Sequence, residues 1–395
     1  MRNYSDRMLI LAVPLLVTAC GGGGSTGSES STPVTQGPAT SSAVTIQATD
    51  LSVDTTSFTV VDALSVTQLD AVRTNDIAAD DTLIVTMEED ISYTQNSARE
   101  PFFRLRLIDA TNFSEVGSLD KVLSVVRMNF NDAGELYIDT TGQGLVRVEV
   151  SDPGNPRIVD RVQTLWGGLE SLTQGNILYQ AAYHHGLFAF NITDRNNPQL
   201  LDEINFDGTL EIQEINNERQ AKGLSDIETQ ARALDIIGNT LFVATRDGGL
   251  FLVDISNPSQ LTVLGHYFVQ QVWDVAVGDA VAYVTVSDGL EILDVNDPAQ
   301  PERLALVELP GNSGRVTINQ NIAVVALDLE FEEVFIEQNG QQVRKMGALV
   351  YHDLATPLTP NNFKLIYFDD PVEESIYKDG AIFAVTRSAI YKLSK

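Results

Sequence analysis

The sequence predicts an all-β protein built from repeated sheets, and three observations support that fold class. A thirteen-residue phrase recurs at intervals of about 41 residues, lengthened twice by insertions. Each copy begins as a β-strand and ends as a turn, and a further apolar strand precedes each copy. Units of this size cannot bury a core alone, so the period indicates a repeat architecture. The copies begin at Pro101, Gly144, Gly186, Gly249, Gly289 and Ala348.

The two halves of the phrase have different local chemistry. Its first half is rich in branched and aromatic residues, as in Leu187, Phe188 and Phe190, which favour strands. Its second half places Asp194 or Asp297 at a turn, where the side chain bonds the backbone two residues on. Pro298 fixes φ and lacks a donor, so the strand stops. We interpret the Asp-Pro motif as a turn, with a metal or catalytic role as the alternative.

The number of sheets follows from the strands that precede the phrase, of which there are seven. One unit shows a full set of four strands, with an inner strand at Val272–Val277 and an outer strand at Arg303–Val307. The last unit has a degenerate third strand at Ala389–Leu393. The seven preceding strands are Leu83–Met87, Leu136–Ile138, Ile177–Gln180, Leu241–Ala244, Val281–Val284, Ile322–Ala326 and Ile382–Val385.

The two chain ends are expected to share one sheet. The last unit, beginning near Glu374, lacks an outer strand, whereas the N-terminal stretch has a surplus strand within Phe58–Val66. Pairing them would close the ring and remove a bare sheet edge. The sequence therefore predicts a seven-bladed β-propeller over residues 43–395, with an N-terminal strand completing the last blade.

The copies GLFLVDISNP from Gly249 and GLEILDVNDP from Gly289 give the chain a family resemblance. They resemble the LVIVD-repeat family of bacterial exported β-propellers, and the resemblance covers about Leu69 to Lys395. It implies a propeller on an exported protein and no particular activity.

The N-terminus has the pattern of an export signal. Basic residues at Arg2 and Arg7 flank a short polar start, and Met8–Val17 is an apolar run too short to span a bilayer. The following Val-Thr-Ala-Cys resembles the bacterial lipobox, which implies removal of residues 1–19 and lipidation, including palmitate, at Cys20. An ordinary signal peptide with a chance cysteine is the alternative.

Residues 20–42 follow as a lipidated cysteine and a linker of Gly, Ser, Thr and Pro, which cannot pack and should act as a tether. In lipoproteins an Asp after the cysteine is associated with inner-membrane retention, and the residue here is Gly21. We expect an outer-membrane lipoprotein of the cell envelope, with periplasmic or surface exposure left open.

Composition limits the classes of partner. The chain has 25 Lys plus Arg against 54 Asp plus Glu, a formal charge of −29 that repels phosphate backbones. Nucleic-acid binding is therefore not expected, whereas basic partners or cations are attracted. The single cysteine excludes an intramolecular disulfide and a thiolate metal cluster. We expect a monomeric propeller without a cofactor.

Three long insertions, at Glu88–Glu100, Asp207–Gln230 and Asp328–Met346, predict where binding occurs. The first and third join second and third strands, and the middle one joins blades three and four. In a propeller these connections emerge on one face. Long loops on a rigid scaffold are the usual place for binding, so this face is the expected recognition surface.

Aromatic, imidazole and carboxylate side chains are expected on the same face and could hold a sugar, a peptide or a small ligand. Neighbouring histidines in a strand point to opposite sides, so only one of the pair readily faces a ligand. For Trp273, packing in the channel wall is the alternative. The candidate ligand-binding residues are Trp166, His184, His185, Trp273 and Asp274, with Tyr183 beside them.

Metal-binding and catalytic motifs are absent from the sequence. Acidic clusters such as Glu88–Asp90 and Glu330–Glu333 lack the Ca²⁺-loop pattern and are interpreted as solvated charge. There is no nucleophile elbow, zinc motif or phosphate loop. The histidines fall on three blades, with His266 and His352 expected in outer strands. Carboxylates that could still meet across the channel are Asp70, Glu170, Asp235, Asp274 and Glu374.

Three functional hypotheses follow. The first is a lipid-anchored envelope module that binds a protein or polymer through its loop-rich face and has no enzymatic activity. The second is an envelope hydrolase or lyase that uses channel carboxylates as acid and base. The third is structural or adhesive display.

Overall fold

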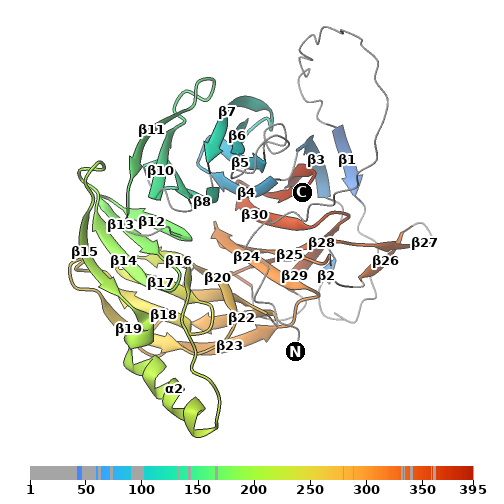
Figure 1. The fold of residues 1–395 in the computed structure, drawn as a ribbon. Coiled ribbons are helices and arrows are strands. Elements are labelled where there is room, and N and C mark those ends of the chain that lie inside the picture. Colours follow the sequence, from blue (N-terminus) through green and yellow to red (C-terminus); the bar gives the residue numbers. More distant parts are fainter. Residues whose placement is uncertain are drawn as a thin grey trace, which may run out of the picture. The chain divides into compact units, whose positions relative to one another are not determined.

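Seven four-stranded antiparallel sheets follow one another along the chain and surround a common axis (Figure 1). The computed structural model describes residues 42–46, 59–60, 64–71, 74–89 and 102–394, the last range with short gaps at 124, 132, 141–143, 165–167, 279, 288, 331, 333, 339–340, 357 and 359–361. The innermost strands of successive blades contact one another all the way round the ring. The predicted seven-bladed β-propeller is therefore confirmed.

The first three blades are formed consecutively, each from its inner to its outer strand. They are β4 (Thr74–Ala79), β5 (Leu83–Glu89), β6 (Phe102–Asp109) and β7 (Glu115–Leu123); β8 (Val125–Phe130), β9 (Leu136–Thr140), β10 (Gly144–Glu149) and β11 (Arg157–Val162); and β12 (Glu170–Gln174), β13 (Ile177–Ala181), β14 (Leu187–Asn191) and β15 (Gln199–Ile204).

The fourth and fifth blades repeat this order, and the sixth contains an inserted hairpin between its second and third strands. Their strands are β16 (Ala231–Ile237), β17 (Thr240–Thr245), β18 (Gly249–Asp254) and β19 (Thr262–Tyr267); β20 (Val272–Gly278), β21 (Val281–Val286), β22 (Gly289–Asp294) and β23 (Glu302–Val307); and β24 (Asn312–Asn319), β25 (Ile322–Asp328), β28 (Gly347–Asp353) and β29 (Phe363–Phe368).

The seventh blade joins both ends of the propeller, as predicted. It consists of β30 (Val372–Lys378), β31 (Ala381–Thr386), β32 (Ala389–Ser394) and, as outer strand, β3 (Leu64–Asp70). The antiparallel register of β3 and β32 pairs Asp70 with Ala389. The N-terminal segment therefore covers an edge that β32 would otherwise expose.

The predicted position of the closing strand, Phe58–Val66, is wrong by several residues. Apolar residues continue beyond Val66 to Leu69, and the stretch from Ser65 to Asp70 pairs with β32. The earlier stretch contains β2 (Thr59–Val60), which pairs in parallel with β29 of blade 6. A fifth strand, β1 (Ser42–Ile46), pairs with β3. One apolar stretch of sequence thus supplies strands to two neighbouring blades. The sequence alone does not show which residues belong to which blade.

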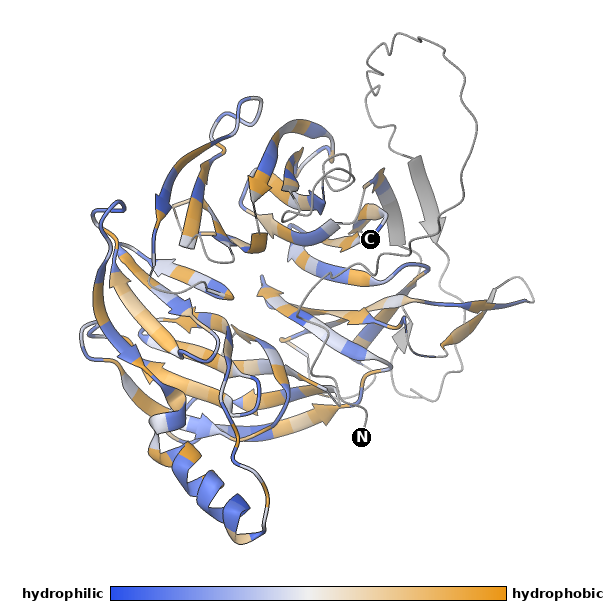
Figure 2. Cartoon of the chain, in the orientation of Figure 1, coloured by the Kyte–Doolittle hydropathy of each residue, from blue (hydrophilic) through white to orange (hydrophobic). Residues whose placement is uncertain are grey.

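The hydrophobic core lies between adjacent sheets. One cluster, for example, combines Tyr283 and Ile292 of blade 5 with Val325 and Phe363 of blade 6. The second strands are covered on both faces, and every residue of β31 is buried. Figure 2 shows these central strands as largely hydrophobic. This double burial explains the continuous apolar runs that marked all seven second strands in the sequence.

The Asp-Pro turns have the predicted chemistry. The backbone N–H of Asn196 donates to Asp194 Oδ1 at 3.1 Å. The backbone N–H of Ala299 donates in the same way to Asp297 Oδ1 at 3.0 Å. These turns end the third strands, as the Asx side chains and prolines indicated.

The same turns also dock on the preceding blade. A Cβ at Gly265 in the outer strand of blade 4 would lie 2.1 Å from the Pro298 carbonyl oxygen of blade 5. A Cβ at Gly117 of blade 1 would lie 1.7 Å from the Pro153 carbonyl oxygen of blade 2. Such approaches exclude every side chain larger than hydrogen. The turn of one blade therefore closes the seam with its neighbour.

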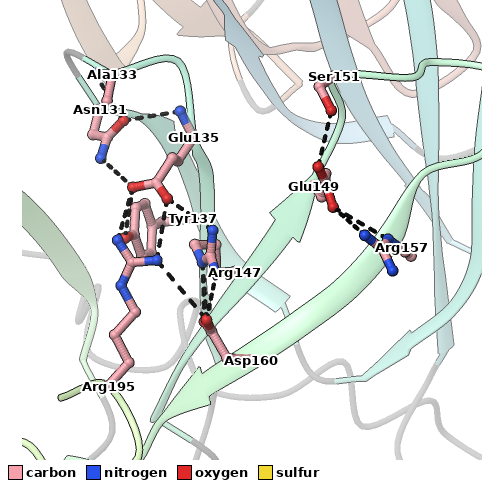
Figure 3. Close-up of polar contacts among 10 residues, drawn as sticks. All are labelled: Asn131, Ala133, Glu135, Tyr137, Arg147, Glu149, Ser151, Arg157, Asp160 and Arg195. Atoms are coloured by element: carbon pink, nitrogen blue, oxygen red, sulfur yellow. Dashed lines mark hydrogen bonds and ion pairs between the residues drawn. The ribbon is translucent and has the colours of Figure 1, made fainter.

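Ion pairs replace this glycine contact between blades 2 and 3 (Figure 3). Arg195, in the turn of blade 3, pairs with Glu135 of blade 2 at 3.0 Å and lies 3.8 Å from Asp160. Arg147 of blade 2 donates to Glu135 at 2.8 Å and binds Asp160 as well. Although its side chains are 17 to 25% exposed to solvent, this network fixes the turn of blade 3 against the outer part of blade 2.

Two of the three predicted insertions form local structure on the loop-rich face. The insertion between blades 3 and 4 contains a 3-10 turn, η1 (Phe206–Gly208), and the helix α2 (Leu210–Ala221), which projects from the ring (Figure 1). Blade 6 inserts the hairpin β26 (Phe335–Gln338) and β27 (Gln341–Arg344). Most of the insertion at Glu88–Glu100 lies outside the described residues. Among those described, no helix is long and apolar enough to cross a bilayer.

We expect Gly265→Ala to destabilise the propeller. The added methyl group would collide with backbone of the blade 5 turn, and overpacking of this kind costs about 1 to 3 kcal/mol. Thermal unfolding followed by circular dichroism measures the effect. The matched control is Gly208→Ala, where a Cβ meets nothing within 4 Å. Equal melting temperatures for the two variants would refute turn docking.

Candidate functional site

Ionisable side chains from all seven inner strands line the central channel. In four of these strands the ionisable residue follows a β-bulge, for example the bulge between Val272 and Asp274. A bulge changes the direction of the side chain beside it. The resulting set, one residue from each blade in order, is Asp76, Arg127, Glu170, Asp235, Asp274, Arg315 and Glu374.

Two arginines tie this set together across the ring. Arg127 of blade 2 pairs with Glu170 of blade 3 and, at 3.0 Å, with Asp274 of blade 5. Arg315 of blade 6 pairs with Asp76 of blade 1 at 2.6 Å and with Glu374 of blade 7 at 2.8 Å. We call these six residues the channel plug. Two of its ion pairs, Arg127–Asp274 and Arg315–Asp76, connect blades that are not neighbours in the ring.

The plug carboxylates also hold neighbouring blades together. Asp76 Oδ2 accepts the backbone N–H of Met128 in blade 2 at 2.6 Å. Glu170 accepts that of Leu234 in blade 4 at 2.7 Å. Asp274 accepts that of Val316 in blade 6 at 3.1 Å. Each carboxylate thus reaches the next inner strand along the chain.

Two carboxylates outside the plug make the same contact at other seams. Asp139 of blade 2 accepts the Ser171 N–H of blade 3 at 2.8 Å. Asp235 of blade 4 accepts the Val277 N–H of blade 5 at 2.6 Å. Five of the seven seams therefore contain a carboxylate-to-backbone hydrogen bond.

Negative groups outnumber positive ones in this buried region, because six carboxylates share two guanidinium groups. Burial raises the pKa of Glu170 and Glu374 to about 8, although Arg127 and Arg315 favour their charged forms. Burial also raises the pKa of Asp139 and Asp235 to about 6. The channel therefore holds protons in the folded state near neutral pH.

The channel carboxylates proposed from sequence fall into two groups. Glu170, Asp235, Asp274 and Glu374 do line the channel, but Asp70 does not. Asp70 ends the outer strand of blade 7 and is exposed, because the first inner strand begins only at Thr74. Asp76, in the inner strand of blade 1, occupies the channel position that was expected for Asp70.

A second cluster lies at the mouth of the channel on the loop-rich face, where blades 3, 4 and 5 meet. Tyr183 in a turn of blade 3 exchanges two backbone hydrogen bonds with Ala231 at the start of β16. The N–H of Val272 at the start of β20 donates to the carbonyl of Arg246 in a turn of blade 4, at 2.9 Å. These backbone contacts bring together the side chains of Tyr183, Arg232, Arg246 and Trp273, which we call the mouth cluster.

Cations surround the indole of this cluster. The guanidinium carbon of Arg232 lies 4.9 Å from the Trp273 ring centroid and 5.7 Å from that of Tyr183. That of Arg246 lies 5.6 Å from the Trp273 centroid. Such distances are within the range of cation–π attraction, about 6 Å. Trp273 is half-buried, and its ring contacts arginines as well as the channel wall.

The mouth cluster has an excess of positive charge. Arg232 is buried, and burial together with the charge of Arg246 lowers its pKa. The nearest carboxylate to Arg246 is Asp247, at 3.9 Å from Nε. A bound carboxylate would relieve the repulsion between the two guanidinium groups and form charge-assisted hydrogen bonds with them.

The other predicted site residues are placed as follows. His184 and His185 are exposed in the turn before β14, so the argument from strand alternation is wrong for them. The His184 ring packs edge-on against Tyr183 at 4.1 Å, beside the mouth cluster. Trp166 lies outside the described residues. Asp274 belongs to the channel plug, deeper than Trp273.

His352 was expected in an outer strand and lies instead in β28, the third strand of blade 6. It is buried, and its Nδ1 forms a hydrogen bond with the Tyr283 hydroxyl at 2.8 Å. The phrase copy that begins at Ala348 already includes this position in its strand half, so the expectation of an outer strand conflicted with the repeat itself. The contact is a packing interaction between blades 5 and 6.

Sequence reasoning missed both arginines of the mouth cluster. Arg232 occupies the bulge of β16, and Arg246 the turn after β17, positions that differ in type from blade to blade. Aligning the inner strands would have placed Arg232 level with Trp273. The distance of the two arginines from the Trp273 indole depends on closure of the propeller, which no local sequence pattern indicates.

Comparison with known families supports the repeat assignment. The LVIVD repeat model matches residues 229–269 and 270–305, which correspond to blades 4 and 5. The chain therefore contains LVIVD repeats, and these two repeats include Arg232, Arg246 and Trp273. No match is found among curated proteins.

Solved structures share the fold at low sequence identity. The computationally designed Ika8 protein matches with a TM-score of 0.51 and 13% identity, over 82% of this chain and 96% of that one. The Cps50 (Swd1) β-propeller domain of Myceliophteria thermophila matches with a TM-score of 0.56 and 10% identity, over 83% and 98%. Sqt1 of Saccharomyces cerevisiae matches with a TM-score of 0.52 and 9% identity, over 83% and 98%.

We expect stability to fall as pH rises through the range set by the buried acids. The pKa of Glu374 is about 8 in the folded protein, against an ordinary value of 4.5, so the folded state binds more protons between these values. The free energy of unfolding therefore decreases from about pH 5 to pH 8. Glu374→Gln should flatten this dependence, and thermal melts across pH measure it.

The control for this prediction is Glu302→Gln, at an exposed position of β23. It should retain the pH dependence of the unaltered protein. A melting temperature that rises from pH 5 to pH 8, or that responds equally to both variants, would contradict the assignment of protons to the channel.

Proposed function

We propose that this LVIVD-repeat β-propeller is a lipid-anchored binding module of the cell envelope, which recognises a protein partner through its loop-rich face. The observation that supports this most directly is the mouth cluster. Two arginines and two aromatic rings converge there on a rigid ring of inner strands, beside the exposed imidazole of His184. Arginine and aromatic residues are the usual anchors of protein interfaces.

The charge distribution indicates the chemistry of the partner. The whole chain has a formal charge of −29, which attracts a basic protein at long range. The mouth cluster is locally positive and accepts a carboxylate at short range. A basic partner that presents one acidic side chain or its C-terminal carboxylate satisfies both conditions.

The insertions enlarge the same face. Asp207 accepts the backbone N–H and hydroxyl of Thr229, at 2.6 and 2.8 Å, which fixes the base of the insertion that contains α2. Arg387 of blade 7 pairs with Glu330 of the blade 6 insertion at 3.0 Å. Leu210 and Leu224 remain strongly exposed at the two ends of the helical segment. These features offer a macromolecule more surface than a small ligand requires.

The geometry favours binding over the alternative of an envelope hydrolase or lyase. That alternative needs channel carboxylates that can reach a substrate. Asp274 and Glu374 are buried, and both pair with arginines of the channel plug. Asp274 also accepts a backbone N–H, so these groups already serve to hold the ring together.

The anchor is the part of the proposal that rests on sequence alone. Residues 1–19 as a signal, Cys20 as the lipid attachment site and residues 20–42 as a tether lie largely outside the described structure. Two or more acyl chains would give stable anchoring where one would not. An outer-membrane location would place the loop-rich face among envelope proteins.

The anchor is tested by metabolic labelling with an alkyne fatty acid. We expect the full chain to be labelled and to sediment with outer membranes. Cys20→Ser should abolish labelling and release the protein from the membrane pellet. Labelling that survives this substitution would contradict lipidation at Cys20.

Partner recognition is tested by affinity capture from envelope membranes with the full-length protein. The variant Arg232→Gln/Arg246→Gln should lose co-purifying partners by at least about tenfold, because hydrogen bonds to charged groups contribute about 1.5 to 3 kcal/mol each. The matched control is Arg157→Gln, an exposed arginine of blade 2 paired only with Glu149 among the described residues. Undiminished capture by the double variant would refute the role of the mouth cluster.

A further inference from the structure

The opposite end of the channel contains a separate cavity of about 310 Å³. It lies where the inner strands of blades 2, 3 and 4 end, away from the long insertions. Its walls include Asn129 and Phe130 of β8, Thr173 and Gln174 of β12, and Asp235 of β16. The volume is at the small end of the range of about 300 to 1,000 Å³ that is typical of small-ligand sites.

The channel plug separates this cavity from the mouth cluster. Asn129, in the cavity wall, donates a hydrogen bond to the plug residue Glu170 at 3.3 Å. Ser171, which follows Glu170 in β12 and also lines the cavity, donates through its hydroxyl to Asp139 at 2.6 Å. The cavity is therefore a recess built on the plug, and its occupant is independent of the partner proposed for the loop-rich face.

The wall is polar and almost uncharged. Amides and hydroxyls predominate, from Asn129, Asn131, Ser171, Thr173 and Gln174, and no Lys, Arg or His is present. An anion would find no cation there. Among the described residues no group of His, Cys, Asp or Glu is arranged to hold a metal ion.

The recess contains hydrogen-bonding capacity that the described protein does not use. Asn129 donates through Nδ2 to Glu170, which leaves its Oδ1 without a donor among the described residues. Asp235 receives the backbone N–H groups of Ile236 and Val277, yet a carboxylate has further acceptor positions. A hydroxylated ligand would donate to these acceptors.

We propose that this recess binds a neutral polyhydroxylated ligand, such as one saccharide unit. The amides and the carboxylate match the alternating donors and acceptors of sugar hydroxyls. Phe130, which also lines the recess and is only partly buried, offers apolar ring surface to the C–H face of a pyranose. The size admits one ring and leaves no room for a folded partner.

Binding is tested by calorimetry and ligand-observed NMR on the full-length protein with glucose, galactose, N-acetylglucosamine, maltose and trehalose. Glucuronate and glucosamine serve as charged probes. We expect at least one neutral sugar to bind with a Kd of about 10 mM or tighter, and more tightly than either charged probe. Absence of binding by all five neutral sugars, or preference for a charged probe, would overturn the proposal.

Two variants locate the site. Asn129→Ala should weaken binding by about threefold to tenfold, the effect of one hydrogen bond. Gln174→Trp, at an exposed position on the rim, should abolish binding by filling the entrance.

The control Thr262→Val, at an exposed position of blade 4, should bind like the unaltered protein. The mouth variant Arg232→Gln/Arg246→Gln should also keep its sugar affinity, which separates failure of this site from failure of the proposed partner site. Equal affinities of the Asn129 and Thr262 variants would place the sugar elsewhere and refute the recess.

Discussion

The hydrogen bond that a backbone N–H of one inner strand donates to a buried carboxylate of the preceding blade is the contact on which the ring depends. It occurs at five seams, and Arg127 and Arg315 join the carboxylates across the axis. Burying these charges is costly, and removal of one partner of a buried ion pair typically costs about 3 to 5 kcal/mol. The plug is thus a specificity device: it fixes seven similar sheets in one order, because each ion pair needs a particular blade opposite it.

This use of the axis determines where recognition can take place. A channel filled by two guanidinium groups and their carboxylates gives a substrate no path from face to face. Binding at the axis is therefore confined to the two ends of the channel, and these ends differ in charge and polarity. The loop-side mouth contains Arg232, Arg246 and Trp273 and is locally positive, whereas the opposite recess has amide and hydroxyl walls. One scaffold presents two independent surfaces of different chemistry.

The fold was accessible from sequence because its signals are local. A doubly buried second strand recurs in every blade and an Asx-Pro turn in several, so counting the second strands gives seven sheets and predicts closure by both chain ends. The exact closing strand was misplaced because Thr59–Val60 and Leu64–Asp70 form one apolar pattern that two blades divide between them. The sites were less accessible. Arg127 and Asp274 are 147 residues apart, and bulges shift the side-chain register before four of the plug residues, so their contacts leave no pattern in the sequence.

Turn docking also explains why the insertions occur on one face only. On the other face the turns of blades 2 and 5 fit against a glycine of the preceding blade, and that of blade 3 is held by ion pairs, so a longer turn would open these seams. The connections on the loop-rich face have no such constraint, so they can accept a helix after β15 and a hairpin after β25. A freely extended face suits a macromolecular partner, which needs area. The face with the short turns suits a small ligand. The walls of its recess are already held in place, so ligand binding costs little conformational entropy.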